Sequence, residues 1–85
     1  MRIIWQDGAW TDYTTWACRH PAWHKRINAL VKDIARQGAA SGIGKPEALR
    51  FEWSGWWSRR IDSEHRLIYR VVGSDIEIAA VRYHY

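Results

Sequence analysis

The pattern of apolar residues changes once along the chain, at the small-residue loop 38–44. Before this loop, apolar residues recur at helical spacing and form one stripe, made of Trp23, Ile27, Leu30, Val31 and Ile34. Pro21 suits the first turn of this helix, and Gly38 suits its end. A shorter helix is expected just after Asp7, which is placed to cap it, and a strand is expected over residues 1–5.

Beyond the loop, apolar and polar residues alternate, and this period of two predicts strands. The expected strands cover residues 47–51, 56–62, 66–72 and 77–83, with Gly73 and Ser74 joining the last two as a tight hairpin. Two helices followed by a meander of strands predict an α+β domain, with both helices on one face of an antiparallel sheet. The other face should stay open for an extended anionic ligand.

Composition narrows the class of protein. The 85 residues leave room for one domain, 1–85, and Trp10, Trp16 and Trp23 are expected to add bulk to its core. A single cysteine, Cys18, excludes an intramolecular disulfide and suits a reducing cytoplasm. No apolar run approaches the roughly 18 residues of a membrane span, so no membrane partner is expected. The net charge of +4 favours polyanions without saying which one.

The strand-rich half holds residues that could cleave RNA without a metal. Such cleavage needs a base for the 2′-hydroxyl proton, a cation for the charge building on phosphorus, and an acid for the departing 5′-oxygen. Glu47, Arg66 and His84 could fill these roles in that order. Because the 2′-hydroxyl is the nucleophile, no cofactor is expected, DNA could not react, and the product would be a 2′,3′-cyclic phosphate.

Each of these residues also has a plainer explanation. Glu47 at a strand edge is commonly a solvated carboxylate paired with a neighbouring cation. The strand arginines could be the wet side of a sheet, and His84 could belong to a frayed chain end. His20 and His24 stand at a spacing that can hold a metal, but no third ligand accompanies them, so we expect surface histidines and no metal site.

Four motifs of the second half form a more specific set. They are Gly44-Lys45-Pro46-Glu47, Ser54-Gly55-Trp56-Trp57-Ser58-Arg59-Arg60-Ile61, Glu64-His65-Arg66-Leu67-Ile68-Tyr69 and Arg82-Tyr83-His84-Tyr85. Together with Ile4-Trp5 and residues 25–30, they resemble the YoeB family over nearly the whole chain. That family is a branch of the RelE-like toxins. The resemblance therefore implies a RelE-like (microbial ribonuclease-like) fold, with two N-terminal helices packed on one face of a twisted, mainly antiparallel sheet.

The resemblance also implies a function, that of the toxin in a type II toxin–antitoxin system. Such a toxin enters the A site of the 70S ribosome and cuts mRNA there. Carried over by motif, Glu47 would be the general base, Arg66 the phosphate stabiliser and His84 the general acid. The expected RNA- and phosphate-binding residues are Lys45, Arg50, Arg59, Arg60 and Tyr85, of which Arg60 and Tyr85 match family positions around the scissile phosphate.

The partners implied by the resemblance are a YefM-like antitoxin, the ribosome with its mRNA, operator DNA bound through the antitoxin complex, and a second copy of the toxin. A disordered antitoxin segment would fold over the basic face. Two alternatives differ in function. One is a ParE-like toxin that inhibits DNA gyrase, against which Glu47 and the terminal His84-Tyr85 argue. The other is a non-catalytic RNA-binding module whose arginines and aromatic residues only grip the backbone.

Overall fold

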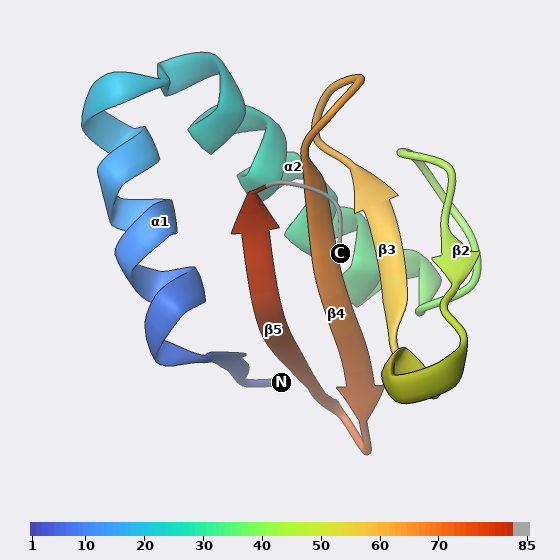
Figure 1. The fold of residues 1–85 in the computed structure, drawn as a ribbon. Coiled ribbons are helices and arrows are strands. Elements are labelled where there is room, and N and C mark those ends of the chain that lie inside the picture. Colours follow the sequence, from blue (N-terminus) through green and yellow to red (C-terminus); the bar gives the residue numbers. More distant parts are fainter. Residues whose placement is uncertain (83–85) are drawn as a thin grey trace.

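The computed structural model describes residues 1–82, which form helices on a five-stranded sheet (Figure 1). The elements are β1 (Ile3–Trp5), α1 (Asp7–Arg19), α2 (Pro21–Gln37), β2 (Glu47–Ala48), the 3-10 helix η1 (Phe51–Trp53), β3 (Trp57–Arg60), β4 (Arg66–Val72) and β5 (Asp75–Arg82). The strands lie in the order β1-β5-β4-β3-β2. β1 is parallel to β5, and the other neighbouring pairs are antiparallel. The expected α+β architecture is confirmed.

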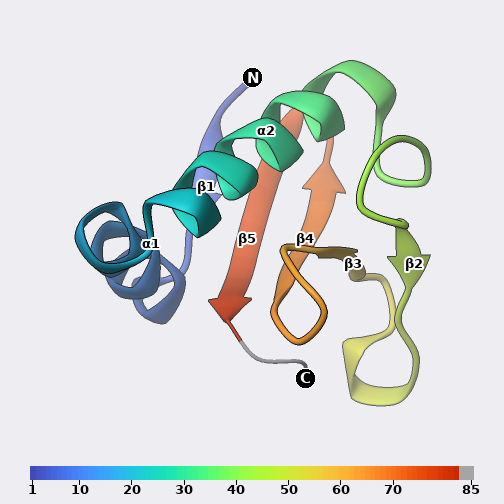
Figure 2. The same cartoon turned by 90° about the horizontal axis from the view of Figure 1, so that it is seen from above.

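Both helices lie on the same side of the sheet, and β2 forms the edge farthest from α1 (Figure 2). The apolar stripe predicted for α2 faces the sheet, with Ile27, Leu30 and Ile34 buried. As predicted, α2 ends at Gly38, which has a φ of 87° and donates its N–H to the Ile34 carbonyl at 2.9 Å. In the part of the chain that the structure describes, no helix is long and apolar enough to cross a membrane.

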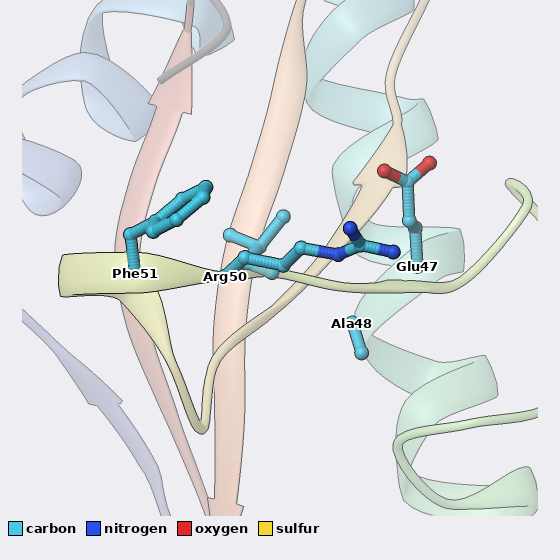
Figure 3. Close-up of a pocket in the computed structure, with 5 residues that line it drawn as sticks. Glu47, Ala48, Arg50 and Phe51 are labelled. Carbon is cyan, nitrogen blue, oxygen red and sulfur yellow. The ribbon is translucent and has the colours of Figure 1, made fainter.

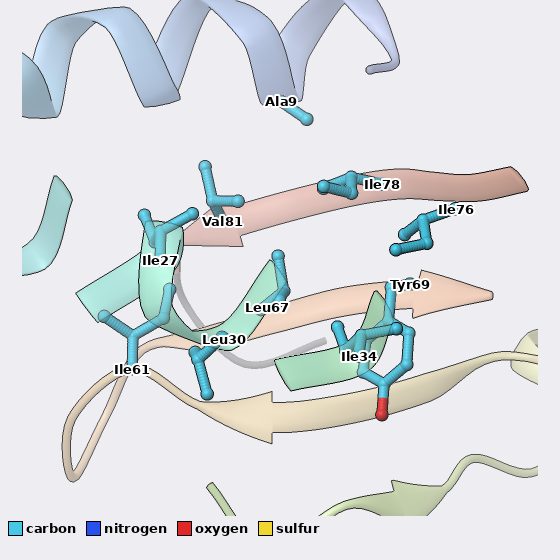
Figure 4. Packing of buried hydrophobic residues seen from close by; sticks show 10 residues of the cluster. All are labelled: Ala9, Ile27, Leu30, Ile34, Ile61, Leu67, Tyr69, Ile76, Ile78 and Val81. Carbon is cyan, nitrogen blue, oxygen red and sulfur yellow. The ribbon is translucent and has the colours of Figure 1, made fainter. Parts of the chain in front are cut away.

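The hydrophobic core fills the layer between the helices and the sheet (Figure 4). Its buried members are Ala9, Ile27, Leu30, Ile34, Ile61, Leu67, Tyr69, Ile76, Ile78 and Val81. Trp16 and Trp23 pack against this cluster as expected, and the Trp16 indole N–H donates to the Val81 carbonyl at 2.8 Å. Trp10 is 51 % exposed, so its expected place in the core was wrong. It follows Ala9, which faces the core, and so lies about 100° further round the helix.

Several boundaries differ from the sequence prediction. β1 begins at Ile3, β3 covers only Trp57–Arg60, and β5 begins at Asp75. Asp7 is the first residue of α1 rather than its cap, a position taken by Gln6 without a side-chain capping bond. The strand expected over residues 47–51 ends at Ala48. Its continuation is prevented at Phe51, whose φ of 57° turns the chain into η1. The hairpin at Gly73-Ser74 is confirmed, with a φ of 62° at Gly73 that suits a tight two-residue turn.

The guanidinium of Arg59 is fully buried and holds the loop 38–44 against the sheet. It donates to the Asp33 carboxylate at 2.6 Å, to the Tyr69 hydroxyl at 2.9 Å, and to the carbonyls of Gly38, Ser41 and Ile43 at 2.9, 2.6 and 3.1 Å. The Tyr69 hydroxyl in turn donates to the Ala39 carbonyl at 2.6 Å. The guanidinium of Arg59 therefore supplies donors to three carbonyls of a loop that contains no regular structure.

The expectation that Arg59 binds RNA or phosphate is therefore wrong, because its side chain has no exposed surface and its donors bond within the protein. Its partner Asp33 also accepts the Ile43 N–H at 2.9 Å. That backbone bond, followed by the bond from Arg59, lowers the pKa of Asp33, which keeps the carboxylate ionised. A Cβ at Gly42 would collide with this carboxylate, so the loop requires glycine there.

The Arg59 bonds can be tested by removing one hydroxyl. Tyr69→Phe leaves a buried N–H of Arg59 and the half-buried Ala39 carbonyl without their partner, so we expect a loss of about 1–3 kcal/mol in the free energy of unfolding in urea. Tyr13→Phe is the matched control, since the Tyr13 hydroxyl bonds to Asn28 at a half-buried position that water can reach. Equal losses of unfolding free energy in the two variants would show that the hydrogen bonds around Arg59 stabilise the fold no more than an ordinary half-buried hydroxyl does.

Candidate functional site

Arginines gather on the face of the sheet opposite the helices. Arg66 on β4 pairs directly with Arg60 on β3 and with Arg82 on β5. Residues paired directly across a sheet point to the same face, so these side chains form one row, here called the arginine row. Like charges at opposed positions destabilise a sheet. Arg66 and Arg82 have partners within the protein, whereas within residues 1–82 no bond is seen for the side chain of Arg60. The arginine row places three cations on neighbouring strands, an arrangement that suits a polyanionic ligand.

Glu47 lies on the same face as the arginine row. It pairs with Ser58 on β3, which is two residues before Arg60 and therefore on the same face. Ser58 pairs in turn with Ile68, two residues after Arg66. Glu47 and Arg66 are separated by two inter-strand spacings across the sheet and by two residues along β4. Their Cα atoms therefore lie about 12 Å apart. Side chains of this length can approach one phosphate from opposite sides.

The turn between β3 and β4 positions the head of Arg66. Its Nη1 donates to the carbonyls of Asp62 and His65 at 2.9 and 3.1 Å. The turn is itself fixed by the Asp62 carboxylate, which accepts the N–H groups of Glu64 and His65 at 2.8 and 2.6 Å. Burial opposes ionisation of Asp62, but these backbone bonds outweigh it and lower its pKa. The half-buried Arg66 is thus held by backbone atoms before any ligand binds.

Glu47 also lines a pocket of about 360 Å³ formed by residues 47–51 (Figure 3). Figure 3 shows the side chains of Glu47 and Phe51 on one side of this segment and Ala48 on the other, with Arg50 running along the segment toward Glu47. Glu47 and Arg50 are exposed. The segment is bent at both ends, with a φ of 53° at Lys45 and 57° at Phe51. Positive φ at bulky residues is unfavourable and is found most often at functional sites.

The remaining predicted residues differ in what the structure shows. Lys45 is exposed beside Glu47, and Arg60 is exposed in the arginine row. Arg59 is excluded by its burial. His84 and Tyr85 lie outside the described residues, so their predicted roles stay predictions. Between residues 1 and 82, no three His, Cys, Asp or Glu side chains are grouped to hold a metal.

Sequence reasoning missed Arg82 as a site residue. Counting outward from the hairpin turn, Val72 pairs with Asp75 and Tyr69 with Ile78, which would place residue 81 opposite Arg66. The register shifts by one at a β-bulge in β5, where Ala79 is an extra residue between the partners of Tyr69 and Ile68, so that Arg82 takes that place. Arg82 also lies 3.5 Å from the Asp12 carboxylate of α1. The alternation of residues gives no sign of a bulge, and only the register reveals the third arginine.

The chain has clear relatives among known proteins. A family model described as the YoeB-like toxin of bacterial type II toxin–antitoxin systems matches residues 5–85. Toxin YoeB of Escherichia coli (strain K12) is 47% identical over 85 residues, covering 100% of both chains. The toxin fold in the YoeB-YefM complex from Staphylococcus aureus superposes with a TM-score of 0.95 at 44% identity, covering 100% of this chain and 98% of that one. A YoeB dimer from the same organism gives 0.94 at 44% identity, with the same coverage. These likenesses confirm the expected RelE-like fold.

Repulsion within the arginine row makes a testable prediction. Arg60→Gln removes one of three aligned charges, so we expect the free energy of unfolding at low ionic strength to rise by up to about 1 kcal/mol. The gain should shrink near 1 M salt, where screening acts over about 3 Å. Lys25→Gln, which changes the net charge equally on the exposed side of α2, is the control for urea unfolding at both salt concentrations. A loss of stability in Arg60→Gln at low salt would contradict repulsion within the row.

Proposed function

The chain belongs to the YoeB-like toxins of bacterial type II toxin–antitoxin systems, and from this we propose that it is a ribosome-dependent endoribonuclease, an mRNA interferase. It cuts mRNA in the A site of the 70S ribosome. The observation that supports this most is the placement of Glu47 on the same face as the arginine row. A carboxylate on the same face as several cations, one of which is held by backbone atoms, suits proton removal next to a phosphodiester.

The proposed reaction uses side chains and the RNA itself. Glu47 takes the proton of the 2′-hydroxyl, and the resulting oxygen attacks the adjacent phosphorus. Arg66, together with Arg60 and Arg82, stabilises the negative charge that develops on the phosphate oxygens. The bond to the 5′-oxygen breaks, and His84 supplies the proton that this leaving group takes up. One product ends in a 2′,3′-cyclic phosphate and the other begins with a 5′-hydroxyl.

The openness of this face supports the dependence on the ribosome. Glu47, Arg50 and Arg60 are exposed, so within residues 1–82 this face encloses little of a substrate. A bound mRNA held in the A site is already positioned, which supplies the orientation that the open face lacks. The net charge of +4 draws the chain toward the polyanionic ribosome. Lys45 and Arg50, beside Glu47, are the residues we expect to contact the RNA backbone.

The proposed partners follow from the same surface and from the relatives. The Staphylococcus aureus relative was solved with YefM and also as a dimer. We expect this chain to bind a YefM-like antitoxin whose disordered, acidic segment covers the arginine row and Glu47. We also expect it to form a homodimer and, through the antitoxin, to bind operator DNA. Its place of action is the cytoplasm, where ribosomes translate.

Cleavage on programmed ribosomes tests the proposed function. The antitoxin-free chain is mixed with mRNA alone and with ribosomes whose A site is open, and the cut ends and terminal phosphates are mapped. We expect cuts only with ribosomes, at the A-site codon, ending in a 2′,3′-cyclic phosphate. No cut in either sample, with the protein folded, would favour a gyrase inhibitor or a non-catalytic RNA-binding module instead.

The role of Glu47 is tested by an isosteric change. Glu47→Gln keeps the side-chain shape but removes the base, so single-turnover cleavage on the ribosome should fall about 10²- to 10⁴-fold while ribosome binding changes little. His84→Ala should lose cleavage in the same way if it is the general acid. Glu64→Gln, an exposed carboxylate in the β3–β4 turn, is the control and should cut like the parent. Parental rates in Glu47→Gln would remove Glu47 from the mechanism.

A further inference from the structure

Phe51 is held in an exposed position that the fold itself does not use. Its side chain is 90 % exposed, compared with 63 % for Met1 and 54 % for Val72. A phenyl ring has no polar group that gains from water, and burial is its usual contribution to stability. The ring therefore contributes little to the packing of the domain.

The backbone conformation of Phe51 is also unfavourable for the stability of the fold. A φ of 57° places it in the left-handed region, which is a marked outlier for a bulky residue. Bonds on both sides hold it there, because the Arg50 carbonyl accepts the Trp53 N–H at 3.1 Å and the Phe51 carbonyl accepts the Ser54 N–H at 2.9 Å. The Leu49 N–H donates to the Trp56 carbonyl at 2.9 Å and anchors the preceding chain to the sheet. The ring is thus presented from a fixed support.

The ring shares a pocket with the proposed base. Glu47, Arg50 and Phe51 line the same hollow, and Figure 3 shows Glu47 and Phe51 on one side of the segment with Arg50 extending along it toward Glu47. At most about 14 Å of chain separates Glu47 from Phe51, since they are four residues apart. A carboxylate, a guanidinium and an exposed ring within this span match the sugar, phosphate and base of single-stranded RNA.

We propose that the Phe51 ring stacks on a nucleobase flanking the scissile phosphate and thereby helps to select the codon that is cut. This inference rests on the proposed function and names the part of the substrate that the ring recognises. Stacking on an aromatic side chain tolerates every base, but purines offer the larger face. The ring therefore favours a purine at the position it contacts. Arg50, next to it in the chain, holds the backbone phosphate of the same stretch.

The test separates the ring from the backbone that carries it. Phe51→Asn removes the ring while keeping a residue that tolerates the left-handed conformation, and Phe51→Trp keeps a stacking surface. Single-turnover cleavage by Phe51→Asn on programmed ribosomes should fall about 10- to 100-fold, with loss of the purine preference across a set of A-site codons. Its melting temperature should rise, because asparagine adopts the left-handed conformation with less strain than phenylalanine does. Phe51→Trp should retain both the rate and the preference.

Trp10→Ala is the control, since it removes another exposed aromatic ring, on α1. It should leave the cleavage rate and codon preference unchanged. If the parent cuts and Phe51→Asn cuts every codon at the parental rate, stacking is overturned while the proposed function stands. Parental cleavage combined with weaker dimerisation or weaker antitoxin binding would overturn it too, by assigning the ring to a protein contact. A parent that does not cut would overturn the function and the inference together.

Discussion

The bonds of one buried guanidinium determine the geometry of this molecule. Arg59 lies where α2, the loop 38–44 and β3 meet, and its donors bond to an aspartate, a tyrosine and three loop carbonyls. The loop carries no regular structure, so this cation supplies the hydrogen-bond donors that a helix or strand would give its carbonyls. Gly44, at the end of the loop, accepts the Arg60 N–H at 2.7 Å. The chain therefore enters β2 in register with β3, and that register puts Glu47 on the open face.

Arg59 and Arg60 are adjacent on β3, so they point to opposite faces of the sheet. One has a structural role and the other lies at the candidate site. Arg59 points to the helix face and is buried with its partners, whereas Arg60 points to the open face and stays exposed. The bulge in β5 makes a similar division, because it keeps Val81 in the core and brings Arg82 into the arginine row. The main hydrophobic cluster lies on one face of the sheet, and the arginine row lies on the other.

Much of this arrangement follows from sequence patterns. The stripe of α2, its ends at Pro21 and Gly38, and the hairpin at residues 73–74 were predicted correctly, because helical period and turn chemistry are local. The burial of Arg59 was not predictable, since it depends on a loop and a helix distant in sequence. The motif resemblance singled out Glu47 and Arg66, but only strand register brings them to one face. The third arginine of the row depends on a bulge that periodicity does not reveal.

The central claim is that this face cuts RNA through the RNA's own 2′-hydroxyl. The most direct test is single-turnover cleavage on ribosomes programmed with mRNA that carries one 2′-deoxynucleotide. A deoxy residue immediately 5′ of the scissile phosphate should abolish the cut, because the nucleophile is gone, while the same change one nucleotide further away should leave cutting intact. Continued cutting at a 2′-deoxy position would require an external nucleophile, such as water, and would contradict the mechanism assigned to Glu47 and the arginine row.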